Sequence, residues 1–337
     1  MKKESVLITG GAGFIGSNLA KTLLRENYRV IVLDDLSRSA TDSLRECYNF
    51  SPDFLFVKGS VTDFDIVDRL MQNVEVVFHL AAQVHWEESI DHPVESFQIN
   101  TIGTLNVLES LRRNSCSKNP VKLMLYASSS EVYGTAQYVP MDEKHPFNPQ
   151  SPYAAGKAAA DRLCSSYYHV YKVPVIILRQ FNTYGPGQRL KGYSAVIPKF
   201  ISQVFTNSPP TIYGNGEQTK DFHYIDDLIS AYITIIKKWK GLDISGQAIN
   251  FGTGKETSIN KLADIILKVA SKKTGKPLKE RLRPIYLPPR PGEVMRFAAD
   301  ISLARTKLGF EPKVCLEEGI AKHIDWFVEN HFGSVQV

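Results

Sequence analysis

The sequence has few cysteines and no pattern among them. The four, Cys47, Cys116, Cys164 and Cys315, are far apart and form neither a C-x-x-C pair nor a metal-ligand spacing. Scattered unpaired thiols are typical of proteins from reducing compartments. We therefore expect a cytoplasmic protein that has neither a disulfide framework nor a metal site.

Long apolar runs are also lacking. A membrane-spanning helix needs roughly 20 consecutive apolar residues, and no stretch of this sequence has that character. The polar residues 1–5 lead directly into a predicted strand, with no apolar signal segment before it. We expect no secretion signal and no membrane partner.

The sequence has no strong excess of one charge. It contains 40 Lys and Arg against 35 Asp and Glu, a formal net charge of +5. No nucleic-acid-reading motif accompanies this mild basic excess, so we expect no nucleic-acid partner. A slight positive bias does suit a small anionic substrate.

What the sequence does contain is an alternation of short apolar runs with amphipathic stretches. Of its 337 residues, 43% are hydrophobic and 22% charged, which is ordinary globular composition. Helical patterns cover 15–25, 100–111 and 153–171. Apolar runs that read as buried strands lie at 6–9, 30–33, 54–57, 76–80, 123–126, 175–178 and 248–252. This order predicts an α/β fold of the Rossmann type, a doubly wound parallel sheet with helices on both faces.

The pattern loosens after about Asn182, where proline and glycine become more frequent. We predict a dinucleotide-binding domain over 1–181, with a returning segment near 222–255. A smaller C-terminal α/β region, 182–221 and 256–330, would bind the substrate. Residues 331–337 are predicted to be a loose tail.

A glycine-rich turn joins the first predicted strand to the first predicted helix. Its glycines are Gly10, Gly13 and Gly16, with Phe14 and Ile15 between the last two. Glycine permits a tight turn and lets backbone N–H groups approach a diphosphate, whose charge the start of the helix favours. Together with the flanking strand and helix, this turn predicts a dinucleotide site.

The acid at the end of the second predicted strand indicates which dinucleotide binds. A carboxylate at Asp34 would accept hydrogen bonds from the adenosine ribose and repel a 2′-phosphate. This favours NAD over NADP as the cofactor, although Arg38 lies close enough to weaken the preference. Asp35 is placed at the same site in a supporting role.

Tyr153 and Lys157 are the central chemical clue. Residues four apart share one face of a helix. An ammonium group one turn from a tyrosine favours the phenolate, which can serve as a base toward a sugar hydroxyl near neutral pH.

These features occur with several others in a fixed order. The motifs are Gly10-x-x-Gly13-x-x-Gly16, His79-Leu80-Ala81-Ala82, Asn100, Ser128-Ser129-Ser130-Glu131-Val132-Tyr133-Gly134, Tyr153-x-x-x-Lys157 and Phe181-Asn182-x-Tyr184-Gly185-Pro186. From residue 5 to about residue 325 the chain resembles the extended short-chain dehydrogenase/reductase family of nucleotide-sugar enzymes. The resemblance implies an NAD-dependent enzyme with a nucleotide-sugar substrate.

The resemblance assigns roles around the cofactor. Tyr153 would be the base, Lys157 would hold the nicotinamide ribose, and Ser129 would hydrogen-bond the reacting sugar oxygen. Further cofactor contacts are assigned to Leu80, Ala81 and Ala82, and Asn100 resembles the family's structural or cofactor-side asparagine. The chain departs from the family at Gly59-Ser60, where Gly-Asp is usual, so we place Ser60 and Val61 at the adenine.

The resemblance also assigns substrate contacts. Asn182 and Arg290 would hold the nucleotide diphosphate, and Gln83 and His85 would lie at the sugar. Lys220 stands where the family usually has arginine, which keeps the charge but loses the bidentate fork.

Glu131 indicates the reaction. Plain 4-epimerases of the family usually lack an acid there, whereas 4,6-dehydratases and uronic-acid decarboxylases have one. A dehydratase needs it as a base for the C5 proton. Many dehydratases have Asp-Glu where this chain has Ser130-Glu131. Ser-Glu resembles the GDP-mannose 4,6-dehydratases and, most closely, the UDP-N-acetylglucosamine 4,6-dehydratases of the legionaminic-acid type.

We therefore expect a 4,6-dehydratase that acts on a nucleotide sugar, with UDP as the expected nucleotide. Four alternatives stay open at this stage: a 4-epimerase, a UDP-glucuronate decarboxylase, a 5,6-dehydratase and a dinucleotide-sensing protein without catalysis. By analogy with the family, we also expect a homodimer that packs through the helices beginning near Asn100 and Tyr153.

Overall fold

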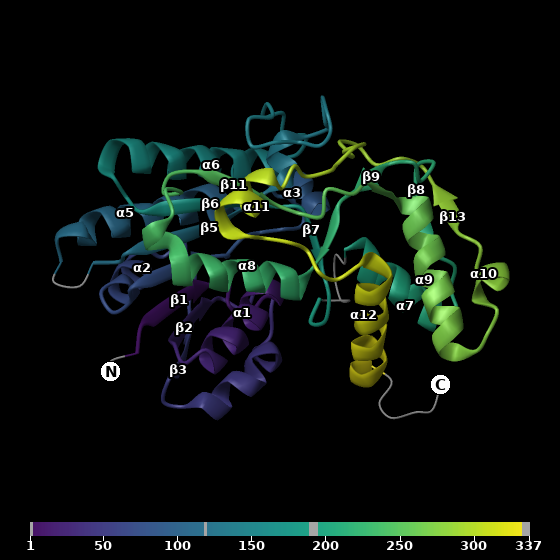
Figure 1. The fold of residues 1–337 in the computed structure, drawn as a ribbon, viewed down its shortest axis with the longest axis horizontal. Helices are drawn as coiled ribbons and strands as arrows, with labels where there is room; N and C mark the ends of the chain where they lie inside the picture. The colour runs from purple at the N-terminus through teal and green to yellow at the C-terminus, as the bar shows by residue number, and fades with distance from the viewer. Residues whose placement is uncertain (1–2, 118–119, 189–194, 332–337) are drawn as a thin grey trace.

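The computed structural model describes residues 3–117, 120–188 and 195–331. Its centre is a seven-stranded sheet in the order β11-β6-β5-β4-β1-β2-β3, and every neighbouring pair is parallel (Figure 1). The strands are β1 (Ser5–Thr9), β2 (Arg29–Asp34), β3 (Phe54–Lys58), β4 (Val76–His79), β5 (Leu123–Ser129), β6 (Val175–Gln180) and β11 (Ala248–Phe251). The predicted doubly wound parallel sheet is confirmed.

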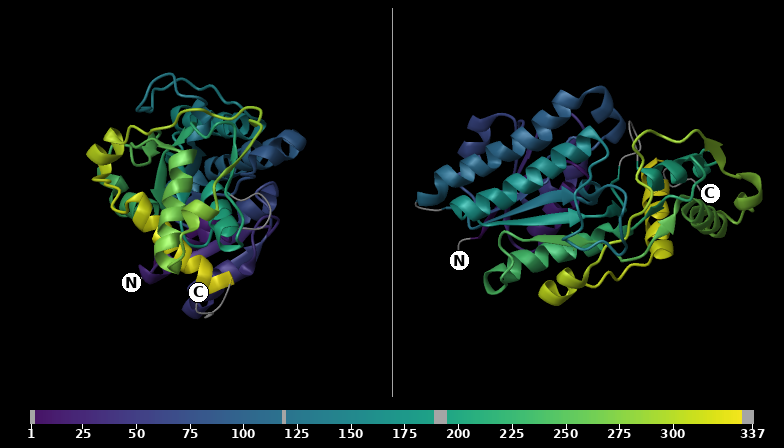
Figure 2. Two further views of the ribbon diagram at one scale, coloured as in Figure 1. Left: turned by 90° about the vertical axis from the view of Figure 1, so that its right-hand side faces the viewer. Right: turned by 90° about the horizontal axis from the view of Figure 1, so that it is seen from above.

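Both faces of the sheet are buried, which explains why its strands are apolar without alternation. In β1, Val6 and Ile8 belong to one apolar cluster, while Leu7 between them belongs to the other. Helices α1 and α8 cover the first face and helices α2, α5 and α6 the second (Figure 2, right). These helices are α1 (Phe14–Arg25), α2 (Phe64–Met71), α5 (Gly103–Arg113), α6 (Pro152–Tyr171) and α8 (Ile225–Lys238).

The helix predicted over 100–111 is part of a longer helical run. It begins with α4 (Pro93–Phe97), widens into a π-helical turn at Gln98–Ile102 and continues as α5. Single π turns inside helices often accompany functional sites. Here the turn contains Asn100, and just before the run lies the short helix α3 (Trp86–Asp91).

Helix α6 begins at a defined point, which fixes Tyr153 in its first turn. The Ser151 side chain accepts a hydrogen bond from the Ala154 N–H, and Pro152 occupies the first helical position, where its missing N–H costs nothing. The helix ends at Lys172, whose φ of 57° is left-handed. The predicted helix over 153–171 is therefore confirmed.

The second, smaller region lies beyond the carboxyl ends of the central strands (Figure 1). Three two-stranded pairs, β7–β10, β8–β13 and β9–β12, connect its segments. Its elements are β7 (Asn182–Tyr184), α7 (Val196–Phe205), β8 (Thr211–Tyr213), β9 (Thr219–Lys220), β10 (Phe222–Tyr224), β12 (Thr257–Ser258), α9 (Ile259–Thr274), α10 (Leu278–Arg281), β13 (Ile285–Leu287) and α12 (Leu316–His331). Between β13 and α12 in the chain comes α11 (Ser302–Leu308), which lies on the sheet side.

The two regions share one apolar core. Ile197 of α7 and Leu262 of α9 belong to the same buried cluster as Val6 and Leu228 of the sheet side. Helix α11 returns to lie against β11 and α8, so the chain crosses between the regions more often than predicted (Figure 1). The predicted tail 331–337 lies, apart from His331, outside the described residues.

No helix in the described parts of the chain is both long and apolar enough to cross a bilayer.

Candidate active site

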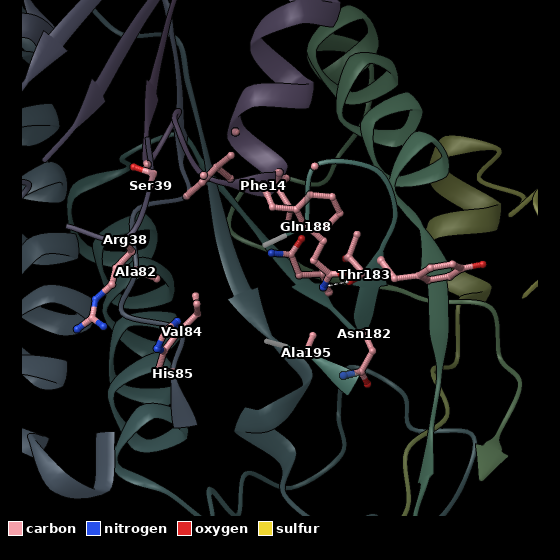
Figure 3. Close-up of a pocket in the computed structure, with 18 of the residues that line it drawn as sticks. Phe14, Arg38, Ser39, Ala82, Val84, His85, Asn182, Thr183, Gln188 and Ala195 are labelled. Atoms are coloured by element: carbon pink, nitrogen blue, oxygen red, sulfur yellow. Dashed lines mark hydrogen bonds between the residues drawn. The ribbon is translucent and has the colours of Figure 1, made fainter. Parts of the chain in front are cut away.

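One large cavity of about 1550 Å³ separates the carboxyl edge of the sheet from the smaller region. All the predicted site residues line it except Asn100. In Figure 3 its wall is formed on one side by residues near Arg38 and Ala82 and on the other by Asn182, Thr183 and Gln188. The fold therefore brings the predicted cofactor and substrate residues to one place.

The glycine turn makes a cradle that side chains would fill. Gly10 has a φ of +70°, and a Cβ there would meet the Ala81 backbone at 2.7 Å. A Cβ on Gly16 would lie 2.4 Å from the Gly10 carbonyl oxygen. Gly13 precedes the first turn of α1, where Phe14 and Ile15 also line the cavity. This arrangement fits a dinucleotide diphosphate at a helix N-terminus.

Asp34 ends β2 and supports that turn. Its carboxylate accepts hydrogen bonds from the Ala12 N–H at 2.9 Å, the Leu36 N–H at 2.9 Å and the Ser39 hydroxyl at 2.6 Å. Asp35 accepts from Ser37 and so closes the following bend. A carboxylate held in this way presents fixed negative charge where an adenosine ribose would lie.

Side-chain hydrogen bonds hold the backbone at Ser60 and Val61, the residues predicted to lie at the adenine. The Asn106 side-chain amide donates to the Val61 carbonyl at 3.0 Å and to the Thr62 carbonyl at 3.2 Å, and the Ser60 hydroxyl pairs with Thr62 at 2.9 Å. Sequence reasoning missed Asn106, which lies six residues after Asn100 in the same helical run.

The segment after β4 runs along the cavity as Leu80, Ala81 and Ala82. Beneath it, His79 bridges Thr9 at 2.7 Å and Thr104 at 2.9 Å. Burial lowers the pKa of His79 to about 3, so it is a neutral structural bridge at pH 7.

The Asn100 side chain forms two hydrogen bonds with the backbone of Gln83. Its side-chain oxygen accepts from the Gln83 N–H at 2.9 Å, and its amide nitrogen donates to the Gln83 carbonyl at 3.0 Å. Gln83 itself donates to the His85 carbonyl and accepts from Ser96. Asn100 therefore shapes the cavity wall from behind, and its predicted role at the cofactor is indirect.

The predicted catalytic residues come from the end of β5 and the start of α6. Ser129 is the last residue of β5, and its hydroxyl accepts from the Glu131 N–H at 3.2 Å. Lys157 is buried, donates to the Ala127 carbonyl and lies 4.7 Å from the centre of the Tyr126 ring. Burial lowers the pKa of Lys157 to about 8.

Glu131 faces a cation from the smaller region. Its carboxylate lies 3.6 Å from the Lys220 ammonium group, which in turn lies 4.4 Å from the centre of the Phe297 ring. Ser130, beside Glu131, is buried. An acid and a cation therefore meet where β9 approaches the end of β5.

Comparison with known proteins identifies the family. A family model described as GDP-mannose 4,6 dehydratase matches residues 7–323. The chain belongs to this family.

Relatives within the family carry out more than one reaction. The chain is 38% identical over 327 residues to a putative UDP-glucose 4-epimerase of Methanocaldococcus jannaschii, covering 97% of this chain and 99% of the relative. It is 36% identical over 331 residues to the dTDP-D-glucose 4,6-dehydratase of Homo sapiens, covering 97% and 91%.

Solved structures similar to this chain likewise include both a dehydratase and an epimerase. DesIV, a dTDP-glucose 4,6-dehydratase of Streptomyces venezuelae solved with NAD, is 28% identical with a TM-score of 0.87, covering 97% of this chain and 98% of that one. A UDP-glucuronic acid 4-epimerase of Bacillus cereus, solved with UDP-glucuronic acid and NAD, is 30% identical with a TM-score of 0.86, covering 97% and 100%. Members of this family depend on NAD, and the glycine cradle and Asp34 fit that cofactor.

In this chain of the dehydratase family, the predicted substrate residues line the far side of the cavity. Arg290 lies near two aromatic rings, 4.5 Å from the centre of Tyr213 and 5.6 Å from that of Trp86. It also contacts Glu293 at 3.1 Å and Glu87 at 3.4 Å. Asn182 lines the same cavity, and its buried side-chain oxygen has no hydrogen-bond partner among the described residues.

A buried polar network behind the catalytic residues was missed by sequence reasoning. Asp161 lies one helical turn after Lys157, accepts from Ser128 at 2.7 Å and forms a bidentate pair with Arg179 at 2.9 and 3.0 Å. Burial would raise the pKa of Asp161, but Arg179 and Arg162 together outweigh this effect and the pKa is lowered. The four-residue spacing of Asp161 from Lys157 could have indicated that Asp161 lies on the same helix face. Nothing in the apolar strand that contains Arg179 indicates that this arginine pairs with it.

Proposed function

We propose that this enzyme is an NAD-dependent nucleotide-sugar 4,6-dehydratase that acts on a UDP-sugar. The observation that carries the proposal is Glu131, which lines the cavity with Ser129 and Tyr153 and faces Lys220 at 3.6 Å. A 4-epimerase needs no carboxylate there, whereas a dehydratase needs a base for the C5 proton. UDP is supported by relatives whose printed names include UDP-sugars.

The cofactor would be held by residues already described. The glycine cradle and the start of α1 would bind its diphosphate, Asp34 and Ser60 its adenosine half, and Lys157 its nicotinamide ribose. When bound, NAD supplies a hydride acceptor for C4 that returns the hydride at C6.

The first proton is moved by Tyr153. The phenolate accepts the proton of the sugar 4-hydroxyl, while the Ser129 hydroxyl donates a hydrogen bond to the same oxygen. The Lys157 ammonium favours the phenolate. With its pKa lowered to about 8, Lys157 is mostly charged at pH 7 and loses that charge above pH 8.

The second proton is moved by Glu131. Once C4 is a ketone, the C5 proton is acidic, and the Glu131 carboxylate accepts it while the C6 hydroxyl departs. The proton taken from the 4-hydroxyl balances the departing hydroxide, so one water is lost. Glu131 then returns its proton to C5, which leaves a 4-keto-6-deoxy sugar.

The decisive experiment combines product mass with two variants. The purified protein is incubated with NAD and a panel of UDP-, GDP- and dTDP-sugars, and products are weighed by mass spectrometry. A dehydratase gives loss of one water, and Glu131→Gln should lower that rate about 10²–10⁴-fold, the usual contribution of a general base. Retention of NAD by the variant shows that the site is intact.

A 4-epimerase is the second candidate, because relatives at 38% and 36% identity are named UDP-glucose 4-epimerases and Ser130 replaces the second acid of many dehydratases. It would give an isomer of unchanged mass, and Glu131→Gln would have little effect. Loss of carbon dioxide from a uronic acid would select a decarboxylase. A protein that binds NAD but is insensitive to Tyr153→Phe would be a sensor.

We also propose a cytoplasmic homodimer. The four cysteines are free thiols, which supports a reducing compartment. Exposed Val94 and Phe97 on α4 and exposed Val170 and Tyr171 at the end of α6 support packing through these helices. Light scattering should give twice the chain mass, and Val94→Glu with Phe97→Glu should give a monomer.

A further inference from the structure

Arg38 lies where an NADP-binding protein would keep its phosphate-binding cation. It is four residues after Asp34, in a loop that lines the cavity beside the end of β2. An arginine near this strand end accommodates the 2′-phosphate of NADP in related folds, because its guanidinium matches phosphate geometry. The position of Arg38 in the sequence therefore does not explain why the enzyme uses NAD.

In the structure the Arg38 guanidinium is already paired with a carboxylate of the protein. Both terminal nitrogens of Arg38 donate to the two carboxylate oxygens of Glu88, in helix α3. The Arg38 hydrogen bond is the main cause that lowers the pKa of Glu88, so the pair is ionic. Figure 3 shows the Arg38 side chain running away from Ser39, toward the side of the cavity where Val84 and His85 lie.

Glu88 is held from a second side. The His85 Nδ1 lies 3.0 Å from its carboxylate. The side chains of Arg38 and Glu88 are 32% and 25% exposed, so the pair is partly shielded from water and its attraction is stronger than that of a surface pair. Glu95 also approaches Arg38, but only to 4.0 Å and with a side chain that is 56% exposed.

We propose that Glu88 determines the selectivity of this enzyme for NAD over NADP by holding Arg38 away from the adenosine ribose. A 2′-phosphate would then meet the Asp34 carboxylate without a cation to compensate its charge. NAD, which carries a hydroxyl at that position, loses nothing by the Arg38–Glu88 pairing. Selectivity is thus divided between Asp34, which repels the phosphate, and Glu88, which neutralises the group that would attract it.

The test is cofactor competition with Glu88→Gln, which keeps the shape of the side chain and removes its charge. The protein is incubated with an excess of an equimolar NAD and NADP mixture and desalted, and the nucleotides that remain bound are quantified. We expect the bound NADP:NAD ratio to rise at least tenfold over wild type, with NAD binding itself retained. Thermal shifts with each nucleotide alone give an independent reading of the same preference.

Two further variants separate the proposed cause from general electrostatics. Glu95→Gln removes an acid near Arg38 that makes no hydrogen bond to it, and it should leave the ratio unchanged. Adding Arg38→Ala to Glu88→Gln should abolish the gain, whereas Arg38→Ala alone should change the ratio little. The proposal fails if Glu88→Gln gives no gain, if Glu95→Gln gives an equal one, or if the gain survives Arg38→Ala. Because the readout is bound nucleotide, it is independent of which sugar reaction the enzyme performs.

Discussion

The two walls of the cavity are built in different ways. On the cofactor wall, side chains hold backbone that continues from the sheet: Asp34 holds Ala12, and Asn100 holds Gln83. On the substrate wall, side chains from distant segments meet each other. Lys220 faces Glu131, and Arg290 reaches back to Glu87, 203 positions earlier in the chain.

This difference explains how one fold serves several reactions. Positions set by parallel strands and close backbone approach tolerate few changes, so we expect the cofactor site to vary less than the substrate wall. Pairs of side chains between loops can be exchanged without moving the sheet. Accordingly, a dehydratase and an epimerase that share 28% and 30% identity with this chain have nearly equal TM-scores of 0.87 and 0.86.

The largest expected effect is at Tyr153, where the two walls meet. Tyr153→Phe removes one oxygen and the base, so turnover should fall about 10²–10⁴-fold. NAD binding and the melting temperature should stay close to wild type. Steady-state kinetics and thermal melts measure both quantities, and normal turnover would show that the assigned base is wrong.

The next largest effect is expected from a substitution in the glycine turn of the cofactor wall. Gly16→Ala places a methyl group 2.4 Å from the Gly10 carbonyl oxygen, so the turn must open and NAD binding should weaken at least tenfold. Gly241→Ala is the matched control, since a Cβ there meets nothing within 4 Å. Calorimetric titration of NAD measures the difference, and equal affinity in the two variants would contradict the proposed cradle.

A substitution on the substrate wall should weaken substrate binding and leave NAD affinity unchanged. Arg290→Ala removes a charged group that lies near two rings, and we expect KM for the nucleotide sugar to rise roughly 10- to 100-fold, as loss of a charge-assisted contact of about 1.5–3 kcal/mol implies. Arg290→Lys keeps the charge and should recover part of the loss. If NAD affinity falls as much as substrate affinity, the two walls are not independent.

The smallest effects at neutral pH concern two buried histidines, one in each region. Burial lowers the pKa of both His79 and His323 to about 3. Their unfolded forms bind protons below pH 6.5, so protonation costs no stability above that pH, and below it each histidine lowers the free energy of unfolding by up to about 1.4 kcal/mol per pH unit as acid is added. Melting temperatures measured from pH 7 to pH 4 should follow this trend.

The same two histidines differ in their contacts. His79 has a partner on each ring nitrogen, whereas both nitrogens of His323 lack one among the described residues. His79→Phe should therefore destabilise the fold by roughly 1–3 kcal/mol, while His323→Phe should stabilise it and weaken the pH dependence. His92→Phe, at an exposed position, is the control. An equal loss of stability from His79→Phe and His323→Phe would contradict the proposed difference between the two sites.

Much of the cofactor wall could be predicted from the sequence because its chemistry is local. Gly10, Gly13 and Gly16 lie within seven residues, and Tyr153 and Lys157 lie one helical turn apart. Strand and helix periodicity then predicted the parallel sheet, which the structure confirms. The sequence left open whether Asn100 is structural or contacts the cofactor, because an amide can hold backbone as well as ligand, and the structure shows it bonded to the Gln83 backbone.

The charge pairs on both walls of the cavity were decided only by the tertiary structure. No periodicity relates Arg38 to Glu88 or Glu131 to Lys220, since each pair joins segments that the sheet and the smaller region bring together. The buried Asp161–Arg179 pair likewise depends on the register of β6 against α6. By itself the sequence determined where a dinucleotide and a base could act, because short-range geometry suffices for that. Which charges meet across the cavity depends on long-range packing, which a single sequence does not display.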